Sequence, residues 1–307
     1  MVPKFYKILV LVSSICVYSI GNVNGQKKKN FLEDKRPELT FYGSGNIQKS
    51  LETGEAIPAS TGLGVNYTHW FDTTSCKEKT PCKNLLWCYI DKLQLDASIN
   101  VASTVDTIKV KYDANNAIMN SSAFGSSILT PLNSGQAVKI ILRLDFLKPL
   151  FLNKTLIDGF KFKYVGSNRN WGVDVNDPRK VIGATSNYVR AGLFQEFLPK
   201  EFQDDCSINF GLYYAYNSIK GDVGQTSNNS IRTNILGTDK KQFSGPEVSL
   251  EIRLKNLRAE FGYSWLTKRT EVPGLTSGRL VTTISFVGGF GLKLDKDNKD
   301  NKDNKDE

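Results

Sequence analysis

The sequence is poor in the residues on which most metal centres and general-base catalysis depend. It contains one histidine, His69, among 307 residues. Because histidine is the commonest metal ligand and the usual general base near neutral pH, sites built from several histidines are excluded. No run of about 18 apolar residues, the length of a membrane-spanning helix, follows the N-terminal segment. Beyond that segment, a membrane role would depend on β-strands.

The N-terminal segment has the layout of a secretory signal. Lys4 and Lys7 precede an apolar stretch, residues 8–20, which is followed by small or polar residues up to Gly25. A short apolar core between a basic start and a small-residue end is typical of exported proteins. We therefore expect residues 1–25 to be a signal peptide that is removed from the mature chain.

Four cysteines follow this segment, in what we expect to be an oxidising compartment. Four cysteines allow three different pairings, and the sequence does not distinguish them. Their spacing is unlike the CxxC pairs of zinc sites, so no metal is predicted, and nothing in the sequence indicates another cofactor. The disulfide candidates are Cys76, Cys82, Cys88 and Cys206.

Polar segments flank the part of the chain that is expected to fold. Residues 26–37 include three consecutive lysines, and residues 295–307 repeat Asp, Asn and Lys. Such charged, low-complexity ends bury too little apolar surface to form a core. The sequence thus predicts a polar N-terminal segment at 26–37, a folded region at 38–294 and a disordered charged tail at 295–307.

Within the folded region, apolar residues alternate with polar or small residues in many segments of about ten residues. In the clearest segment, 248–254, the even positions are apolar; Asn256 then turns the chain, and a second alternating segment runs to Trp265. A period of two is that of a β-strand whose two faces differ. We expect an all-β fold of roughly 8–12 strands, about ten as the best count, with residues 39–50 as an extra segment or as one of twelve strands.

Strand and loop lengths favour a transmembrane barrel. A strand that crosses a bilayer needs about 9–11 residues, whereas strands of globular proteins average about 5–6, and the alternating segments are mostly of the longer kind. Aromatic residues gather near segment ends, as at Trp70, Trp87 and Trp265, where membrane barrels carry interfacial girdles. Tight connections such as Asn256 also contrast with long polar ones such as residues 220–246.

In these features the sequence resembles the outer-membrane β-barrel proteins of Gram-negative bacteria, porin-like in the broad sense, over residues 39–294. The resemblance implies an antiparallel transmembrane β-barrel in outer-membrane lipid, with an even strand number, short periplasmic turns and longer external loops. It also implies that Asn256 is a periplasmic turn. If residues 93–113 form a hairpin, residues 76–88 then fall in an external loop.

A barrel with apolar residues toward lipid has its alternate positions toward the lumen. Cations outnumber carboxylates at these positions, so an open pore for a small solute would favour anions. Alternatively, the charges pair with one another inside a narrow or plugged barrel that has a structural or docking role. The pore-lining candidates are Lys139, Arg143, Asp145, Lys161, Lys163, Glu251, Arg253, Arg258 and Glu260.

Enzymatic and nucleic-acid-binding functions are not predicted. His69 lies among aromatic residues at a segment end, and no GxSxG motif accompanies it. Basic residues alternate along strands rather than forming an exposed stripe, which disfavours nucleic acid as a partner. The alternative is a secreted, disulfide-stapled β-sandwich for binding or adhesion, in which Leu250, Leu254, Phe261, Ile284 and Phe286 would lie in a core instead of facing lipid.

Overall fold

The fold is an all-β structure whose strands are long. A computed structural model describes residues 37–50, 56–71, 90–102, 137–146, 157–172, 181–197, 206–222, 224–225, 239–254, 256–266 and 279–293. The strands range from 8 residues in β9 to 16 in β6 and β7. They are β1 Glu38–Ser50, β2 Ala56–Trp70, β3 Ile90–Ala102, β4 Ala137–Phe146, β5 Gly159–Gly172, β6 Val181–Glu196, β7 Cys206–Gly221, β8 Gln242–Leu254, β9 Leu257–Ser264 and β10 Arg279–Lys293.

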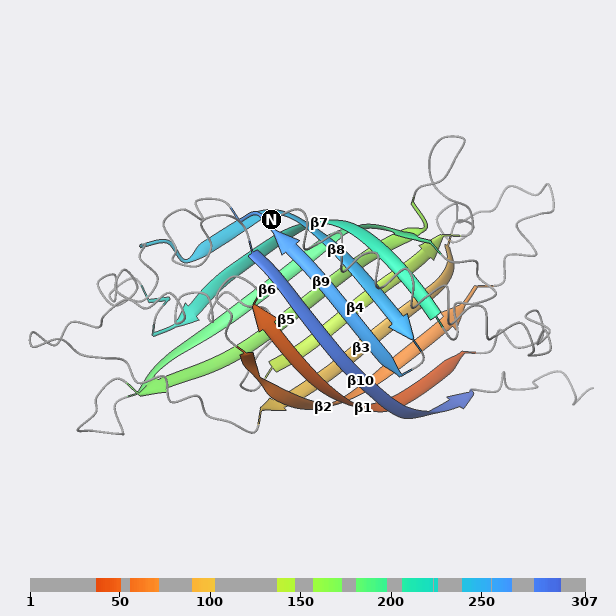
Figure 1. Cartoon of the computed structure of the whole chain (residues 1–307), viewed down its shortest axis with the longest axis horizontal. Coiled ribbons are helices and arrows are strands. Elements are labelled where there is room, and N and C mark those ends of the chain that lie inside the picture. Colours follow the sequence, from red (N-terminus) through yellow and green to blue (C-terminus); the bar gives the residue numbers. More distant parts are fainter. Residues whose placement is uncertain are drawn as a thin grey trace, which may run out of the picture. The chain divides into compact units, whose positions relative to one another are not determined.

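The ten strands form one closed sheet (Figure 1). Each strand pairs antiparallel with its neighbours in sequence, and β1 pairs with β10 from Glu38 opposite Lys293 to Ser50 opposite Val281. The predicted antiparallel barrel of about ten strands is confirmed. A sandwich of two sheets is wrong, because closure of β1 on β10 leaves a single continuous sheet. Within the described ranges, no helix has the length and hydropathy needed to cross a membrane.

Alternation of side chains gives the barrel an apolar outer face. On β7 the side chains of Leu212 and Tyr214 are 58% and 59% exposed, whereas their neighbours Tyr213 and Ala215 are buried. Phe286 and Ile284 on β10 are also exposed, as the barrel interpretation predicts. Ile252 departs from this pattern, since it is buried although it shares the phase of the half-buried Leu250 and Leu254.

The strand that differs most from expectation is β1. It was expected as an extra segment beyond the ten strands or as one of twelve, yet it joins β10 to β2 and so completes the ring of ten. The residues at 107–113, counted as a strand in the sequence-based estimate, lie outside the described part of the chain. The count of ten is therefore right, but β1 takes the place of a strand predicted after β3.

Because β1 replaces a strand that was predicted after β3, the strand ends that flank the cysteine-containing connection lie at the other end of the barrel from the one predicted. Glu38 lies opposite both Lys293 and Thr68, and the turn at Asn256 adjoins the same half of β10, because Leu257 pairs with Phe286. The end of β2 and the start of β3, which flank residues 76–88, thus lie at the barrel end that carries Asn256. They do not lie at the opposite end, as predicted, because one strand fewer separates them from β8. Residues 76–88 themselves are outside the described ranges.

Candidate functional site in the barrel interior

The barrel interior contains a network of ion pairs, which starts from two lysines on β5. Lys161 and Lys163 alternate with Phe160 and Phe162, so the lysines point inward while the phenylalanines face outward. Both lysine side chains are almost completely buried, with exposed fractions of 6% and 4%. A buried ammonium group is tolerated only where a carboxylate compensates it, and each lysine has such a partner.

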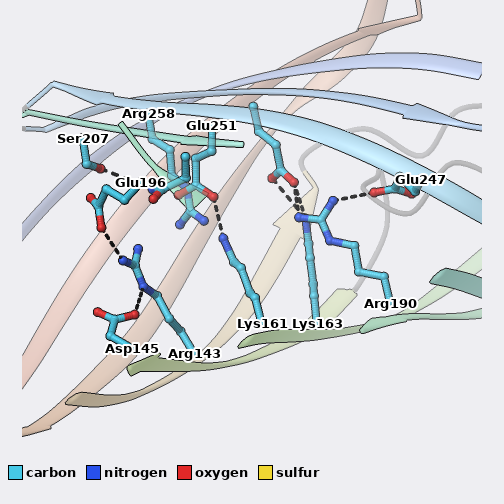
Figure 2. Close-up of polar contacts among 12 residues, drawn as sticks. Arg143, Asp145, Lys161, Lys163, Arg190, Glu196, Ser207, Glu247, Glu251 and Arg258 are labelled. Atoms are coloured by element: carbon cyan, nitrogen blue, oxygen red, sulfur yellow. Dashed lines mark hydrogen bonds and ion pairs between the residues drawn. The ribbon is translucent and has the colours of Figure 1, made fainter. Parts of the chain in front are cut away.

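Lys161 pairs with a glutamate on β8. Its Nζ lies 2.5 Å from Oε2 of Glu251. The other oxygen, Oε1 of Glu251, lies 2.9 Å from Nε of Arg258 on β9. One carboxylate therefore binds two cations that come from opposite sides of it, and the pair Lys161–Glu251 joins β5 to β8 across the interior (Figure 2).

Lys163 belongs to a larger group centred on Glu260 of β9. Its Nζ lies 3.1 Å from Oε2 of Glu260, and Arg190 of β6 pairs with Oε1 of the same carboxylate. Through Nη1, Arg190 also donates to Glu247 at 2.5 Å, and the Tyr188 hydroxyl donates to the second oxygen of Glu247 at 2.6 Å. The Arg190 guanidinium carbon lies 4.6 Å from the centroid of the Tyr213 ring. Arg190 therefore links β6, β8 and β9 (Figure 2).

A third group lies closer to the barrel end that carries Asn256. Arg143 of β4 donates through Nε to Asp145 at 2.6 Å and through Nη2 to Glu196 of β6 at 2.9 Å. Lys92 of β3 binds the other oxygen of Asp145 at 2.8 Å. The guanidinium of Arg143 also lies 4.5 Å from the centre of the Phe194 ring, which fixes its position between β4 and β6.

These three groups fill one side of the lumen with side chains. The pairs join strands that are not neighbours in the sheet: β4 with β6, β5 with β8 and β9, and β6 with β8 and β9. A barrel of about eight strands is just wide enough to be filled by its own side chains, and ten strands enclose only slightly more. The ion-pair network therefore crosses the lumen.

The opposite side of the lumen is built differently. Tyr42 of β1 lies across Gly64 of β2 and donates its hydroxyl to both oxygens of Asp96 on β3 at 2.8 Å. A Cβ atom on Gly64 would collide with the Tyr42 ring and with Cβ of Ser98. Glycine is therefore required for Tyr42 to lie flat against the barrel wall.

Seven of the nine sequence-predicted interior residues meet in the ion pairs described above. Lys139 points inward from β4 and makes no ion pair with any described residue. Arg253 lies one residue before the end of β8 and is exposed. The candidates that meet in the network are Arg143, Asp145, Lys161, Lys163, Glu251, Arg258 and Glu260.

Sequence reasoning missed five charged residues of the interior, and three of these are carboxylates. Glu247 directly precedes the alternating segment that was recognised, and Glu196 and Arg190 lie in a strand with weaker alternation. Their phase was a usable signal, because Arg190 lies between the outward residues Val189 and Ala191. With Asp96, Lys92 and these residues included, the excess of interior cations is smaller than the sequence-derived list indicated. The missed residues are Lys92, Asp96, Arg190, Glu196 and Glu247.

His69 and the cysteines are not part of this interior site. His69 is on the outer face of β2, where its ring lies 6.3 Å from Tyr67 and 4.8 Å from Phe71. Cys206 begins β7 and is buried, whereas Cys76, Cys82 and Cys88 lie outside the described ranges, so the disulfides stay a prediction. Among the described residues, no group of three or more His, Cys, Asp or Glu side chains is arranged to hold a metal ion.

Comparison with known proteins gives structural matches only. No family model and no curated protein matches the chain. Ail, the attachment invasion locus protein of Yersinia pestis, solved with the heparin analogue sucrose octasulfate, is 10% identical with a TM-score of 0.23, over 84% of this chain and 99% of that chain. The outer-membrane protease OmpT from Escherichia coli is 10% identical with a TM-score of 0.29, over 84% and 95%. An outer-membrane channel from Pseudomonas putida F1 is 10% identical with a TM-score of 0.28, over 86% and 100%.

These matches are to outer-membrane β-barrel proteins of Gram-negative bacteria, the class that the sequence resembles. Their printed activities differ from one another: a protease, a channel and an attachment protein. At this level of identity and TM-score, the fold assignment stands on the strand pairing of the chain itself.

Proposed function

We propose that the chain is a non-enzymatic β-barrel protein of the outer membrane, exported by residues 1–25, whose lumen is closed by its own side chains. Its role in this proposal is structural or docking rather than that of an open diffusion pore. The observation that carries the closed lumen is the pair of buried bridges Lys161–Glu251 and Lys163–Glu260, which join β5 to β8 and β9.

Support for a membrane location comes from the outer face. On β7, outward apolar side chains run from Ile208 to Tyr216 and give way to Ser218 and Lys220. Soluble monomers rarely expose a continuous apolar surface of this extent, whereas a barrel in lipid requires it. Exposed large apolar residues occur around the sheet, at Phe41, Leu63, Leu95, Ile99, Val138, Ile140, Leu193, Phe210, Leu212, Ile284, Phe286, Phe290 and Leu292.

Aromatic residues edge this apolar surface. In the half of β7 away from Asn256, Tyr214 and Tyr216 face outward, and at the end of β9 Tyr263 packs edge-to-face on Trp265 with ring centroids 4.4 Å apart. At the other end, Tyr67, His69 and Phe71 stack along β2. Aromatic side chains of this kind occupy the two membrane–water interfaces of outer-membrane barrels. The position of His69 in such an edge also supports the non-enzymatic proposal, because it faces away from the interior carboxylates.

A second candidate function is a narrow pore for small anions. It is favoured by the inward Arg258, whose side chain is 25% exposed while its partner Glu251 is 9% exposed. A solvent-accessible interior cation attracts anions into a channel. The two candidates differ in one measurable property, the conductance of the unmodified barrel.

Two experiments test the proposal. First, the membrane-extracted protein is run on a detergent gel before and after boiling; a closed barrel migrates differently until it is heated. Recovery as a soluble protein without a mobility change would contradict the membrane location.

Second, conductance is recorded in planar lipid bilayers for the wild type and for the double variant Lys161→Ala, Lys163→Ala. We expect no stepwise conductance from the wild type and clear steps from the variant, because alanine removes both bridges across the lumen. Lys220→Ala, at an exposed outward position of β7, is the control and should behave as the wild type. If the wild type and the double variant show conductance steps of equal size, the wild-type lumen is open, and the narrow pore replaces the closed barrel as the function.

A further inference from the structure

The last strand, β10, extends well beyond its neighbour β9 at the barrel end that carries Asn256. The last pair between the two strands joins Leu257, the first residue of β9, to Phe286. Over residues 288–293, β10 stays paired with β1 on its other side, but no described residue pairs with it on the β9 side (Figure 1). This stretch of β10 is therefore a free strand edge.

Other strand ends at this end of the barrel are closed by hydrogen bonds from residues beside them. Asp158, just before β5, donates its amide to the Phe194 carbonyl at 3.0 Å, and its carboxylate accepts the Glu196 amide at 2.7 Å. Where β6 adjoins β7, the Phe197 amide donates to the Ile208 carbonyl at 2.9 Å. No such bond within the described part of the chain closes the free edge of β10.

The backbone of the free edge is accessible. In an antiparallel sheet, the backbone groups of alternate residues point to the same neighbouring strand. The amide of Val287 donates to the Asn256 carbonyl at 2.8 Å and so points toward β9. The backbone groups of Gly289, Gly291 and Lys293 therefore point to the free edge. Both glycines are exposed and have no side chain to shield these groups, whereas sheet edges are usually protected by charged side chains, proline or bulges.

The outer face beside this edge is apolar. Phe290 and Leu292 are 65% and 50% exposed, and the Phe290 ring stacks on that of Phe41 of β1 with centroids 5.6 Å apart. Unpaired backbone groups next to an apolar surface that excludes water are unfavourable. An acyl chain cannot satisfy a row of backbone donors and acceptors, whereas an extended polypeptide can.

We infer that the free edge of β10, residues 288–293, binds an extended segment of another polypeptide as an added antiparallel strand. The segment continues the line of β9, with apolar residues beside Phe290 and Leu292 and polar residues at the alternate, inward positions. A second copy of the barrel does not fit, because barrels inserted in the same direction carry β10 strands that run the same way. The site rests on the barrel of the proposed function and gives its docking role a partner, but it does not depend on whether the lumen conducts.

The test is titration of a fluorescently labelled peptide of alternating valine and threonine with the full-length, detergent-purified barrel, followed by anisotropy. The wild type should bind the peptide saturably. With valine outward, the threonine amides point to β10, so N-methylation of the threonines should lower the affinity about tenfold or more by removing hydrogen bonds. N-methylation of the valines, whose amides point away from β10, is the matched control and should leave the affinity unchanged.

Two variants locate the binding on the edge. Gly291→Pro removes an edge-facing amide without removing a hydrogen bond to β1, and its Cβ atom displaces only the flexible carboxylate end of Glu38; it should weaken binding several-fold. Gly288→Ala, whose backbone groups point to β1, should match the wild type. Binding should also slow the amide hydrogen exchange of residues 288–293 in the wild type.

Absence of saturable binding by the wild type, or equal affinities of the two methylated peptides, would overturn the edge site; neither titration needs a variant to assemble. An oligomer of the purified barrel that Gly291→Pro converts to monomers would assign the edge to a second copy instead. Failure of the site is distinguishable from failure of the proposed function, because the heat-dependent gel shift reports the barrel and the conductance reports the lumen.

Discussion

The inner wall of the barrel has a charged side and a neutral side. On β4, β5, β6, β8 and β9 interior positions carry charged residues that pair between strands, whereas on β10, β1 and β2 they carry mostly glycine, serine and threonine. The charged side fills space with long side chains, and the neutral side keeps its only large described side chain near mid-strand, Tyr42, flat against the wall. The ion-pair network therefore belongs to one part of the wall, and the described glycine-rich part of the wall has no share in it.

The difference shows two ways of satisfying polar groups inside a narrow barrel. On the charged side each buried charge depends on partners from distant strands, so the loss of one partner leaves others uncompensated. On the neutral side the Tyr42 side chain contacts the adjacent strand β2 and the next strand, β3. This contact depends on Gly64, which lets the ring lie close to the backbone. The two sides should consequently respond to substitution by different amounts and for different reasons.

The largest effect is expected for Arg190→Met on the charged side. Arg190 binds Glu247 and Glu260, and its removal leaves two buried carboxylates with fewer partners. We expect a loss of about 3–5 kcal/mol in the free energy of unfolding, measured by urea titration of the barrel in lipid vesicles. The matched control is Lys92→Met, whose partner Asp145 keeps Arg143; this partly exposed pair should contribute about 0–1 kcal/mol. Similar losses in the two variants would remove the distinction between buried and accessible pairs.

A smaller loss is expected for Gly64→Ala on the neutral side. The added methyl group collides with the Tyr42 ring and with Ser98, and such overpacking costs about 1–3 kcal/mol. Gly288→Ala on β10 is the control, because nothing lies within 4 Å of its Cβ position. The same urea titration should show no destabilisation for Gly288→Ala; a loss equal to that of Gly64→Ala would mean that strand propensity, not the Tyr42 contact, determines the effect.

Tyr42→Phe isolates the hydrogen bond from the ring packing. Asp96 loses the donor that binds both of its oxygens, at a cost of about 1–2 kcal/mol. The urea titration used for Gly64→Ala measures this loss. An unchanged free energy of unfolding would show that the Tyr42 hydroxyl contributes nothing beyond the packing of its ring.

The smallest effect on stability is expected for Lys139→Met. Because Lys139 has no ion pair with a described residue, replacing it should be neutral or stabilising, by about 0–1 kcal/mol. A loss comparable to that of Arg190→Met would show that Lys139 is compensated after all.

Much of the fold followed from the sequence, because a strand pattern is local. Alternation identified β9 and β10 almost to the residue, together with the first part of β7 and the second half of β8, and it indicated that Lys161, Lys163 and Glu251 share the inner face. It indicated β1 only as a less regular candidate strand and did not place it in the ring of ten, because glycines and polar residues on both of its faces weaken the contrast between them. It also missed Glu247, which lies in β8 before the first regular apolar position.

What the sequence alone determined is which residues of each strand point inward and which point outward, since that depends only on the two-residue period of a strand. Only the tertiary structure decided that Lys161 meets Glu251, that Arg190 meets Glu260, and that Lys139 meets neither. Contacts across a lumen depend on strand number, register and closure together. Exchanging one strand for another changed the end of the barrel to which residues 76–88 belong, and no local pattern carries that information.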